Sequence, residues 1–138
     1  MFFEARPIIE CVRGQRKVIE KLGWIDVVII ANASPMHMKS EAEHWYNSFS
    51  IGVMGFVELV KAAIPYLEKS SQASIIVPSS FMGREFYRGP PATYGPCKAA
   101  QLQHVQELSH FLGPKGIRVN AISPGPILCK DGPWEKYS

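Results

Sequence analysis

The sequence predicts an α/β fold in which a small parallel sheet is flanked by helices. Two observations carry this prediction. Short runs rich in β-branched and apolar residues at positions 25–31, 74–77 and 117–122 predict strands. Longer stretches with helical spacing of apolar residues separate these runs, which is the alternation typical of a parallel sheet. The run at 25–31 is apolar on both faces, as expected for an interior strand.

Three helices are predicted in chain order. Residues 8–22 have the spacing of an amphipathic helix that ends at Gly23, and residues 41–67 form a long pattern with an aromatic-rich stripe. A third helix begins at residue 94 and ends at residue 112, where Gly113 and Pro114 form a stop signal. With 138 residues the chain is predicted to form one domain.

Composition narrows the class of protein. The chain is 46% hydrophobic and 20% charged, so it is not predicted to be disordered. Its net charge is +3 and its basic residues are scattered, so nucleic-acid binding is not predicted. The longest apolar run, residues 27–31, is too short to span a bilayer, so we expect no membrane partner. Three cysteines without metal-ligand spacing favour a reducing compartment, no metal site and a cytoplasmic location.

Two polar residues that are candidates for ligand binding follow the second predicted strand. The apolar run at 74–77 stops at Pro78 and is followed by Ser79 and Ser80. Open α/β sheets bind ligands beyond the carboxyl ends of their strands. The two serines are therefore predicted to lie at a ligand-binding edge of the sheet.

Tyr94 and Lys98 form the second candidate group. They are four residues apart at the start of a predicted helix, so their side chains leave the same face about one turn apart. A free tyrosine has a pKa of ~10 and is a poor proton donor at neutral pH, but a nearby ammonium stabilises the phenolate and lowers that pKa. Ser80 could hold the same substrate oxygen by a hydrogen bond. Taken alone, the Tyr-x-x-x-Lys spacing also fits an exposed helix pair with no chemical role.

The order of these motifs resembles the catalytic half of the short-chain dehydrogenase/reductase family. The resemblance extends from about residue 18 onward. The matching stretches, in chain order, are Ala31-Asn32-Ala33-Ser34, Pro78-Ser79-Ser80, Tyr94-Gly95-Pro96-Cys97-Lys98 and Ser123-Pro124-Gly125.

The resemblance implies a partial Rossmann-like parallel sheet of about three strands and an NAD(P)-dependent oxidoreductase. Hydride would pass to or from a small carbonyl or alcohol substrate, with NAD or NADP left undetermined. Tyr94 would act as the acid/base, Lys98 would tune it and orient the ribose, and Ser80 would hold the substrate oxygen. The residues implied in cofactor binding are Asn32, Tyr94, Lys98, Pro124, Gly125 and Ile127. Asn32 also fits a simple turn residue that bonds local backbone.

Three departures from the family pattern support an alternative. The sequence has no Thr-Gly-x-x-x-Gly-x-Gly turn for the cofactor phosphates, and its final strand is not apparent, so residues 1–138 are predicted to be a single incomplete catalytic segment. Gly52 stands where many members have a catalytic asparagine in a Val-Asn-x-x-Gly phrase. The chain could therefore be a truncated, non-catalytic relative that associates with other subunits.

Two structural expectations follow from the resemblance. The family commonly pairs subunits through the helices that correspond to residues 41–67 and 94–112, so a homo-oligomer is expected. The strand at 25–31 would lack its neighbour on one side, which would leave an apolar edge unpaired and its side chains incompletely buried.

Overall fold

The computed structural model describes residues 23–31, 41–86 and 92–128, together with positions 14, 17, 20, 21 and 130. Three strands form one parallel sheet in the order β1-β2-β3: β1 spans Val27–Ile29, β2 spans Ser74–Pro78 and β3 spans Arg118–Ile122. The predicted α/β class with about three parallel strands is confirmed. β1 lies at one edge of this sheet, as the family topology implies.

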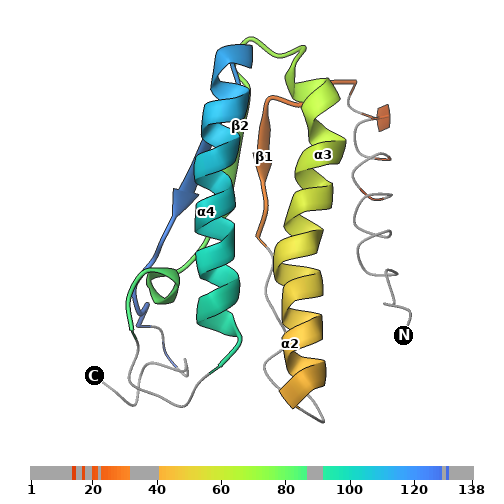
Figure 1. Ribbon diagram of the computed structural model, residues 1–138. Helices are drawn as coiled ribbons and strands as arrows, with labels where there is room; N and C mark the ends of the chain where they lie inside the picture. The colour runs from red at the N-terminus through yellow and green to blue at the C-terminus, as the bar shows by residue number, and fades with distance from the viewer. Residues whose placement is uncertain are drawn as a thin grey trace.

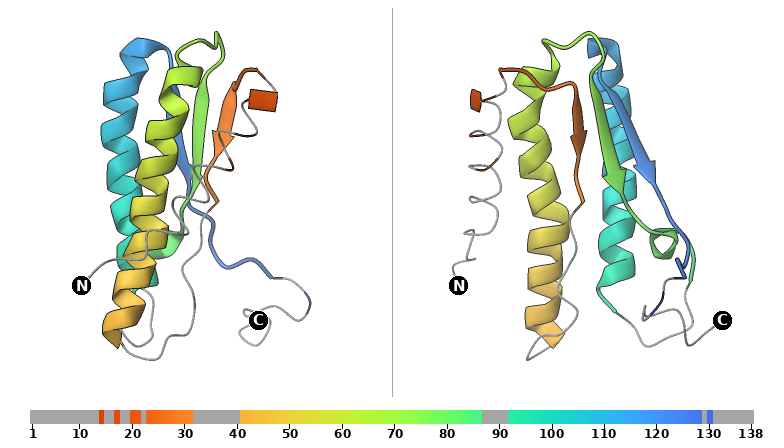
Figure 2. Two further views of the ribbon diagram at one scale, coloured as in Figure 1. Left: turned by 90° about the vertical axis from the view of Figure 1, so that its right-hand side faces the viewer. Right: turned by 180° about the vertical axis from the view of Figure 1, so that it is seen from behind.

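Two long helical runs cover the same face of the sheet (Figures 1 and 2). The first consists of α2 (Glu41–Phe49), a π-helical turn η1 (Ser50–Met54) and α3 (Gly55–Leu67), and the second is α4 (Tyr94–Leu112). Short 3-10 turns, η2 (Phe81–Gly83) and η3 (Gly113–Lys115), follow β2 and α4. The predicted bounds of the helices at 41–67 and 94–112 agree with these elements.

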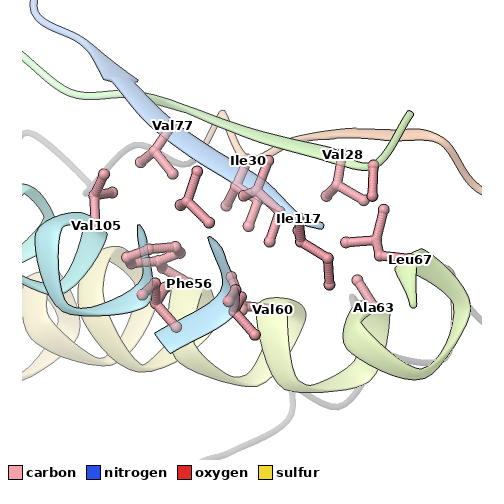
Figure 3. Close-up of a cluster of buried hydrophobic side chains, with 14 residues drawn as sticks. Val28, Ile30, Phe56, Val60, Ala63, Leu67, Val77, Val105 and Ile117 are labelled. Carbon is pink, nitrogen blue, oxygen red and sulfur yellow. The ribbon is translucent and has the colours of Figure 1, made fainter. Parts of the chain in front are cut away.

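The hydrophobic core lies between this face and the two helical runs (Figure 3). Strand side chains alternate between faces, so every second residue of each strand points toward the helices. The buried core residues are Val28, Ile30, Phe56, Val60, Ala63, Leu67, Ala73, Ile75, Val77, Val105, Leu108, Leu112, Ile117 and Val119. The helical members recur every three or four positions, which places them on one stripe of each helix.

The opposite face of the sheet is uncovered by the described residues. Val27 is 52% exposed, Ile29 is 63% exposed and Ile122 is 55% exposed. The prediction that the first strand is buried on both faces is therefore wrong for β1, because the described helices pack on only one of its faces. The expected incomplete burial holds for Val27 and Ile29, whereas Val28 and Ile30 are buried.

The π-helical turn was not predicted. The backbone N–H of Gly55 donates to the Ser50 carbonyl five residues earlier, which widens the helix locally. The loop after β2 also contains the unpredicted turn η2, and Phe86 beyond it is 88% exposed. Within the predicted helix at 8–22, the four described positions 14, 17, 20 and 21 are helical.

The run Glu41–Leu67 has the length and hydropathy of a possible membrane span. It comprises 27 residues, and its most apolar window has a mean hydropathy of 1.4. The core helix of a protein without membrane segments passes the same test, and here Phe56, Val60 and Leu67 pack against the sheet. The absence of a membrane partner stays a prediction.

Candidate active site

The site lies where the carboxyl ends of β2 and β3 meet the first turns of α4. Backbone hydrogen bonds continue the strand pairing past the strand ends. The N–H of Ser79 donates to the Ile122 carbonyl at 2.8 Å, and the N–H of Phe81 donates to the Pro124 carbonyl at 3.1 Å. The loops that follow the two strands are thereby fixed beside each other.

Ser80 is the N-cap of the 3-10 turn η2. Its backbone is extended, with φ −160° and ψ 152°, and its Oγ accepts a hydrogen bond from the Met82 N–H at 3.3 Å. This is the usual role of a serine at a helix N-cap. A hydroxyl that accepts at one lone pair can still donate its hydrogen, so the cap leaves Ser80 chemically competent. The residue is only 7% exposed.

The η2 turn packs directly against α4. A Cβ on Gly83 would lie 2.8 Å from the Lys98 carbonyl carbon and 2.9 Å from the Ala99 nitrogen. From the other side, a Cβ on Gly95 would lie 2.9 Å from the Met82 carbonyl oxygen. Two glycines therefore permit a backbone-to-backbone approach that larger residues would prevent.

Lys98 is the most connected side chain of the site. Its Nζ donates to the Pro78 carbonyl at 3.1 Å and to Gln101 Oε1 at 3.1 Å, and it lies 5.6 Å from the centroid of the Tyr94 ring. Tyr94 itself is half-buried. The predicted pairing of a phenol and an ammonium on one helix face is thus present in the structure, with the ammonium fixed from β2 and from α4.

Burial shapes the electrostatics of this helix turn. Desolvation lowers the pKa of the Lys98 ammonium below its ordinary value, and attraction to the Cys97 thiolate opposes that change. Burial raises the pKa of the Cys97 thiol, and the neighbouring Lys98 charge opposes that change. A cysteine in this state stays protonated at neutral pH, so its side chain packs as a small apolar group.

A buried hydrogen-bonded chain ties the start of α4 to α2. The hydroxyls of Ser48 and Thr93 lie 2.8 Å apart, and Thr93 Oγ1 lies 3.4 Å from His44 Nε2. Thr93 immediately precedes Tyr94. These contacts fix the residue that precedes the first turn of α4.

The predicted cofactor residues after β3 lie at the open end of the sheet. Pro124 is half-buried and bonded to the η2 turn, whereas Gly125 and Ile127 are exposed. Among the described residues, no atom outside its chain neighbours lies within 4 Å of a Cβ built on Gly125. The structure thus brings Ser80, Tyr94 and Lys98 to one end of the sheet, with the Pro124 loop beside them.

Two predictions concern parts of the site that the structure does not settle. Asn32 lies outside the described residues, as does most of the stretch around it. Among the described residues no group of three or more His, Cys, Asp or Glu side chains could bind a metal ion. The absence of a metal site stays a prediction.

Sequence reasoning missed Gln101, although the sequence holds a signal for it. The buried positions of α4 recur at the spacing of one helix face: Cys97, Lys98, Gln101, Val105, Leu108 and Leu112. A polar side chain on this otherwise mostly apolar stripe must be hydrogen-bonded within the protein. The stripe could therefore have identified Gln101 as a candidate partner of Lys98.

Comparisons with known proteins place this geometry in context. A family model described as enoyl-(acyl carrier protein) reductase matches residues 10–132. Isoepoxydon dehydrogenase patN of Penicillium expansum is 85% identical over 119 residues, which cover 86% of this chain and 46% of that protein. The protein of the same name from Aspergillus clavatus is 84% identical over 119 residues. The chain thus spans about half the length of the curated relatives it matches.

Solved structures share the fold. Carveol dehydrogenase from Mycobacterium avium, in complex with NAD, has a TM-score of 0.73 and 26% identity, over 88% of this chain and 46% of its own. A 3-ketoacyl-ACP reductase from Sinorhizobium meliloti has a TM-score of 0.76 and 27% identity, over 91% of this chain and 51% of its own.

Proposed function

Because the chain belongs to the short-chain dehydrogenase/reductase family, we propose that it supplies the catalytic segment of an NAD(P)-dependent oxidoreductase. The observation that carries the proposal is the meeting of three elements. Ser80 at the end of β2, and Tyr94 and Lys98 on the first turns of α4, lie at the ligand-binding end of a parallel sheet.

Proton transfer is the task of Tyr94 in this proposal. In carbonyl reduction its phenol donates a proton to the oxygen that gains negative charge, and in alcohol oxidation the phenolate takes the hydroxyl proton. Lys98 supports the phenolate by its positive charge, and the Pro78 carbonyl fixes that charge in place. Ser80 donates its hydroxyl hydrogen to the same substrate oxygen.

The described residues fit a nicotinamide ring at the end of β3. Gly125 is exposed with open space around it, Ile127 offers an exposed apolar side chain, and Pro124 is bonded to the turn that begins at Ser80. When bound there, the ring supplies or accepts the hydride. Lys98 would also contact the ribose, and Asn32 would complete the pocket. The choice between NAD and NADP depends on the adenosine side, for which this sequence offers no residue.

Identity to the two isoepoxydon dehydrogenases points to a substrate of the same kind for the full-length protein. We therefore expect a small molecule with a carbonyl or alcohol group, and isoepoxydon is the first compound to assay.

Self-association through the helices is the expected assembly. Four aromatic or sulfur-containing side chains of the first helical run are exposed: Trp45, Tyr46, Phe49 and Met54. Trp45 and Phe49 stack with ring centroids 6.0 Å apart, and Phe111 on α4 is also exposed. Exposed aromatic clusters of this kind are common at subunit interfaces.

The proposal is tested by Tyr94→Phe in the full-length protein. We expect turnover of isoepoxydon with NAD or NADP to fall by about 1,000-fold, while far-UV circular dichroism and cofactor affinity change little. Turnover equal to that of the unmodified protein would reject Tyr94 as the acid/base.

A second candidate is the non-catalytic relative that associates with other subunits. The absent Gly-rich turn and Gly52 favour it, and so do the uncovered apolar side chains of Val27, Ile29 and Ile122. Titrating the 138-residue chain with NADH and NADPH while following tryptophan fluorescence separates the two candidates. Saturable binding by the chain alone contradicts the non-catalytic candidate.

A further inference from the structure

Gln101 is a fully buried amide in the middle of the catalytic helix. It is 0% exposed, and its side chain makes a hydrogen bond at each end. Oε1 accepts from Lys98 Nζ at 3.1 Å, and Nε2 donates to the Gly52 carbonyl at 2.6 Å. A buried glutamine with these bonds connects the proposed catalytic lysine on α4 to the backbone of the facing helical run.

The π-helical turn explains why the Gly52 carbonyl is available to α4. Within Ser50–Met54 the backbone bonds span five residues, so the carbonyls of this turn depart from ordinary α-helical register. Gly52 faces Cys97 across the two helical runs, since a Cβ at this position would lie 3.6 Å from Cys97 Cβ, an ordinary contact distance.

The two acceptors around Lys98 come from different elements. The Pro78 carbonyl ends β2, and Gln101 Oε1 projects from α4 one turn beyond the lysine. An ammonium has three N–H donors, so two fixed acceptors determine much of its orientation. The direction in which Nζ faces the Tyr94 ring, 5.6 Å away, depends on both of them.

We infer that Gln101 is the positioning residue of Lys98, and that it anchors the lysine to the facing helical run through the Gly52 carbonyl. This inference rests on the proposed function. The carboxamide that position 52 lacks is supplied from the opposite helix, so the departure at Gly52 is compatible with catalysis. Gln101 acts through Lys98 and touches neither substrate nor cofactor.

The hydrogen bond from Lys98 to Gln101 affects the charge state of the lysine. Burial lowers the pKa of Lys98, which disfavours the charged form that supports a phenolate. A carbonyl oxygen that accepts from Nζ favours the charged form. Two titratable groups of α4 lie beside Lys98: Tyr94, whose ring centroid is 5.6 Å from Nζ, and Cys97, whose charge acts on the lysine. The end of β2 contributes the Pro78 carbonyl.

The test is Gln101→Met in the full-length protein, because methionine fills a similar volume without either hydrogen bond. Gln103→Met, an exposed glutamine on the same helix, is the matched control. We expect kcat to fall about tenfold or more with little change in substrate KM, since the lysine is misplaced and the binding surface is intact. In alcohol oxidation the acidic limb of the kcat/KM profile should move up by about one pH unit, because the misplaced Lys98 charge gives less support to the anionic form of the base.

Gln101→Glu is the second variant, since it keeps an acceptor for Lys98 and loses the amide donor to Gly52. We expect its kcat to lie between those of the unmodified protein and Gln101→Met. If Gln101→Met does not fold, Gln101→Glu alone decides. A kcat and an acidic limb of the kcat/KM profile that both equal those of the unmodified protein would then overturn the inference. Equal losses in both variants with an unmoved acidic limb would also overturn it, because a purely structural role predicts that result.

Tyr94→Phe separates this inference from the proposed function. If Tyr94→Phe is inactive while Gln101→Met keeps its kcat and pH profile, only the role of Gln101 is rejected. If Tyr94→Phe keeps full turnover, the proposed function itself is rejected, and the positioning role goes with it.

Discussion

The corner formed by β2, β3 and α4 differs sharply from the β1 edge of the same sheet. At the corner, backbone bonds from Ser79 and Phe81 join the two strand ends, and the η2 turn lies in backbone contact with α4. At the edge, Val27 and Ile29 project from β1 onto a face that the described helices leave open. The comparison teaches that contacts among the described residues fix the site residues. The same contacts leave the Val27 and Ile29 side chains of the β1 edge exposed.

The largest expected effect compares two isoleucines in neighbouring strands. Ile75 on β2 is fully buried in the core, whereas Ile29 on β1 is mostly exposed. Ile75→Ala should lower the free energy of unfolding by about 3–4 kcal/mol, because it leaves a cavity between sheet and helices. Ile29→Ala should change it by less than about 0.5 kcal/mol.

Urea unfolding of the two variants, followed by circular dichroism, provides the measurement. Equal losses would mean that β1 is buried on both faces in solution. That result would show that another part of the protein or a second copy covers the open face.

The backbone contact at the corner can be broken by a single methyl group. In Gly83→Ala the new Cβ would meet the peptide between Lys98 and Ala99 at 2.8–2.9 Å, so η2 or α4 must move. We expect turnover to fall about 100-fold, since small misplacements of catalytic groups are costly. Gly113→Ala is the control, because nothing lies within 4 Å of its added Cβ. Comparable turnover in both variants would show that the close approach has no catalytic role.

A smaller effect is expected from the buried hydroxyl pair that fixes the start of α4. Thr93→Val keeps the shape of the side chain but leaves the Ser48 hydroxyl without this 2.8 Å partner. The free energy of unfolding should fall by about 1–2 kcal/mol. Thr93→Ser retains the hydroxyl and should lose less than half as much in thermal denaturation. A greater loss in the serine variant would place the contribution in the methyl group.

The smallest effect is a pH dependence of stability. Because burial lowers the pKa of Lys98 in the folded state, the unfolded chain binds more protons between that lowered pKa and the ordinary value of about 10.5. Stability contributed by this group should therefore rise with pH across that window and be lost as the pH falls through the folded-state pKa. Cys97→Ala should be the background, because burial raises the pKa of its thiol and gives the opposite trend.

The measurement is the difference in unfolding free energy between Cys97→Ala and Cys97→Ala/Lys98→Met from pH 7 to 10.5. The variant that retains Lys98 should gain stability relative to the other as the pH rises. A difference that is flat or falls with pH would show that the folded state does not disfavour the lysine charge.

Local patterns were sufficient to predict the main elements. The β-branched run that stops at Pro78 predicted β2, and the Gly113-Pro114 pair predicted the end of α4 at Leu112. The four-residue spacing of Tyr94 and Lys98 predicted their shared helix face, because helical periodicity alone determines it.

The remaining features depend on contacts between distant segments. The link from Gln101 to Gly52 joins residues 49 positions apart, and it requires the π turn, which has no established sequence signal. The interpretation of β1 as a strand covered on both faces was wrong for a similar reason, although incomplete burial of its side chains was expected from the family topology. An apolar strand has the same sequence pattern whether one face or both faces are covered, so the residue types at Val27 and Ile29 did not indicate that their face is open.

The central claim is that Ser80 and Tyr94 act on one substrate oxygen, and a double-mutant cycle tests it most directly. Single-turnover reduction rates should be measured for the full-length protein, Ser80→Ala, Tyr94→Phe and the double variant, each saturated with cofactor. The account predicts that the double variant is about as slow as Tyr94→Phe, because groups that act as a unit give non-additive losses. Losses that multiply in the double variant would contradict it, since the two residues would then act independently.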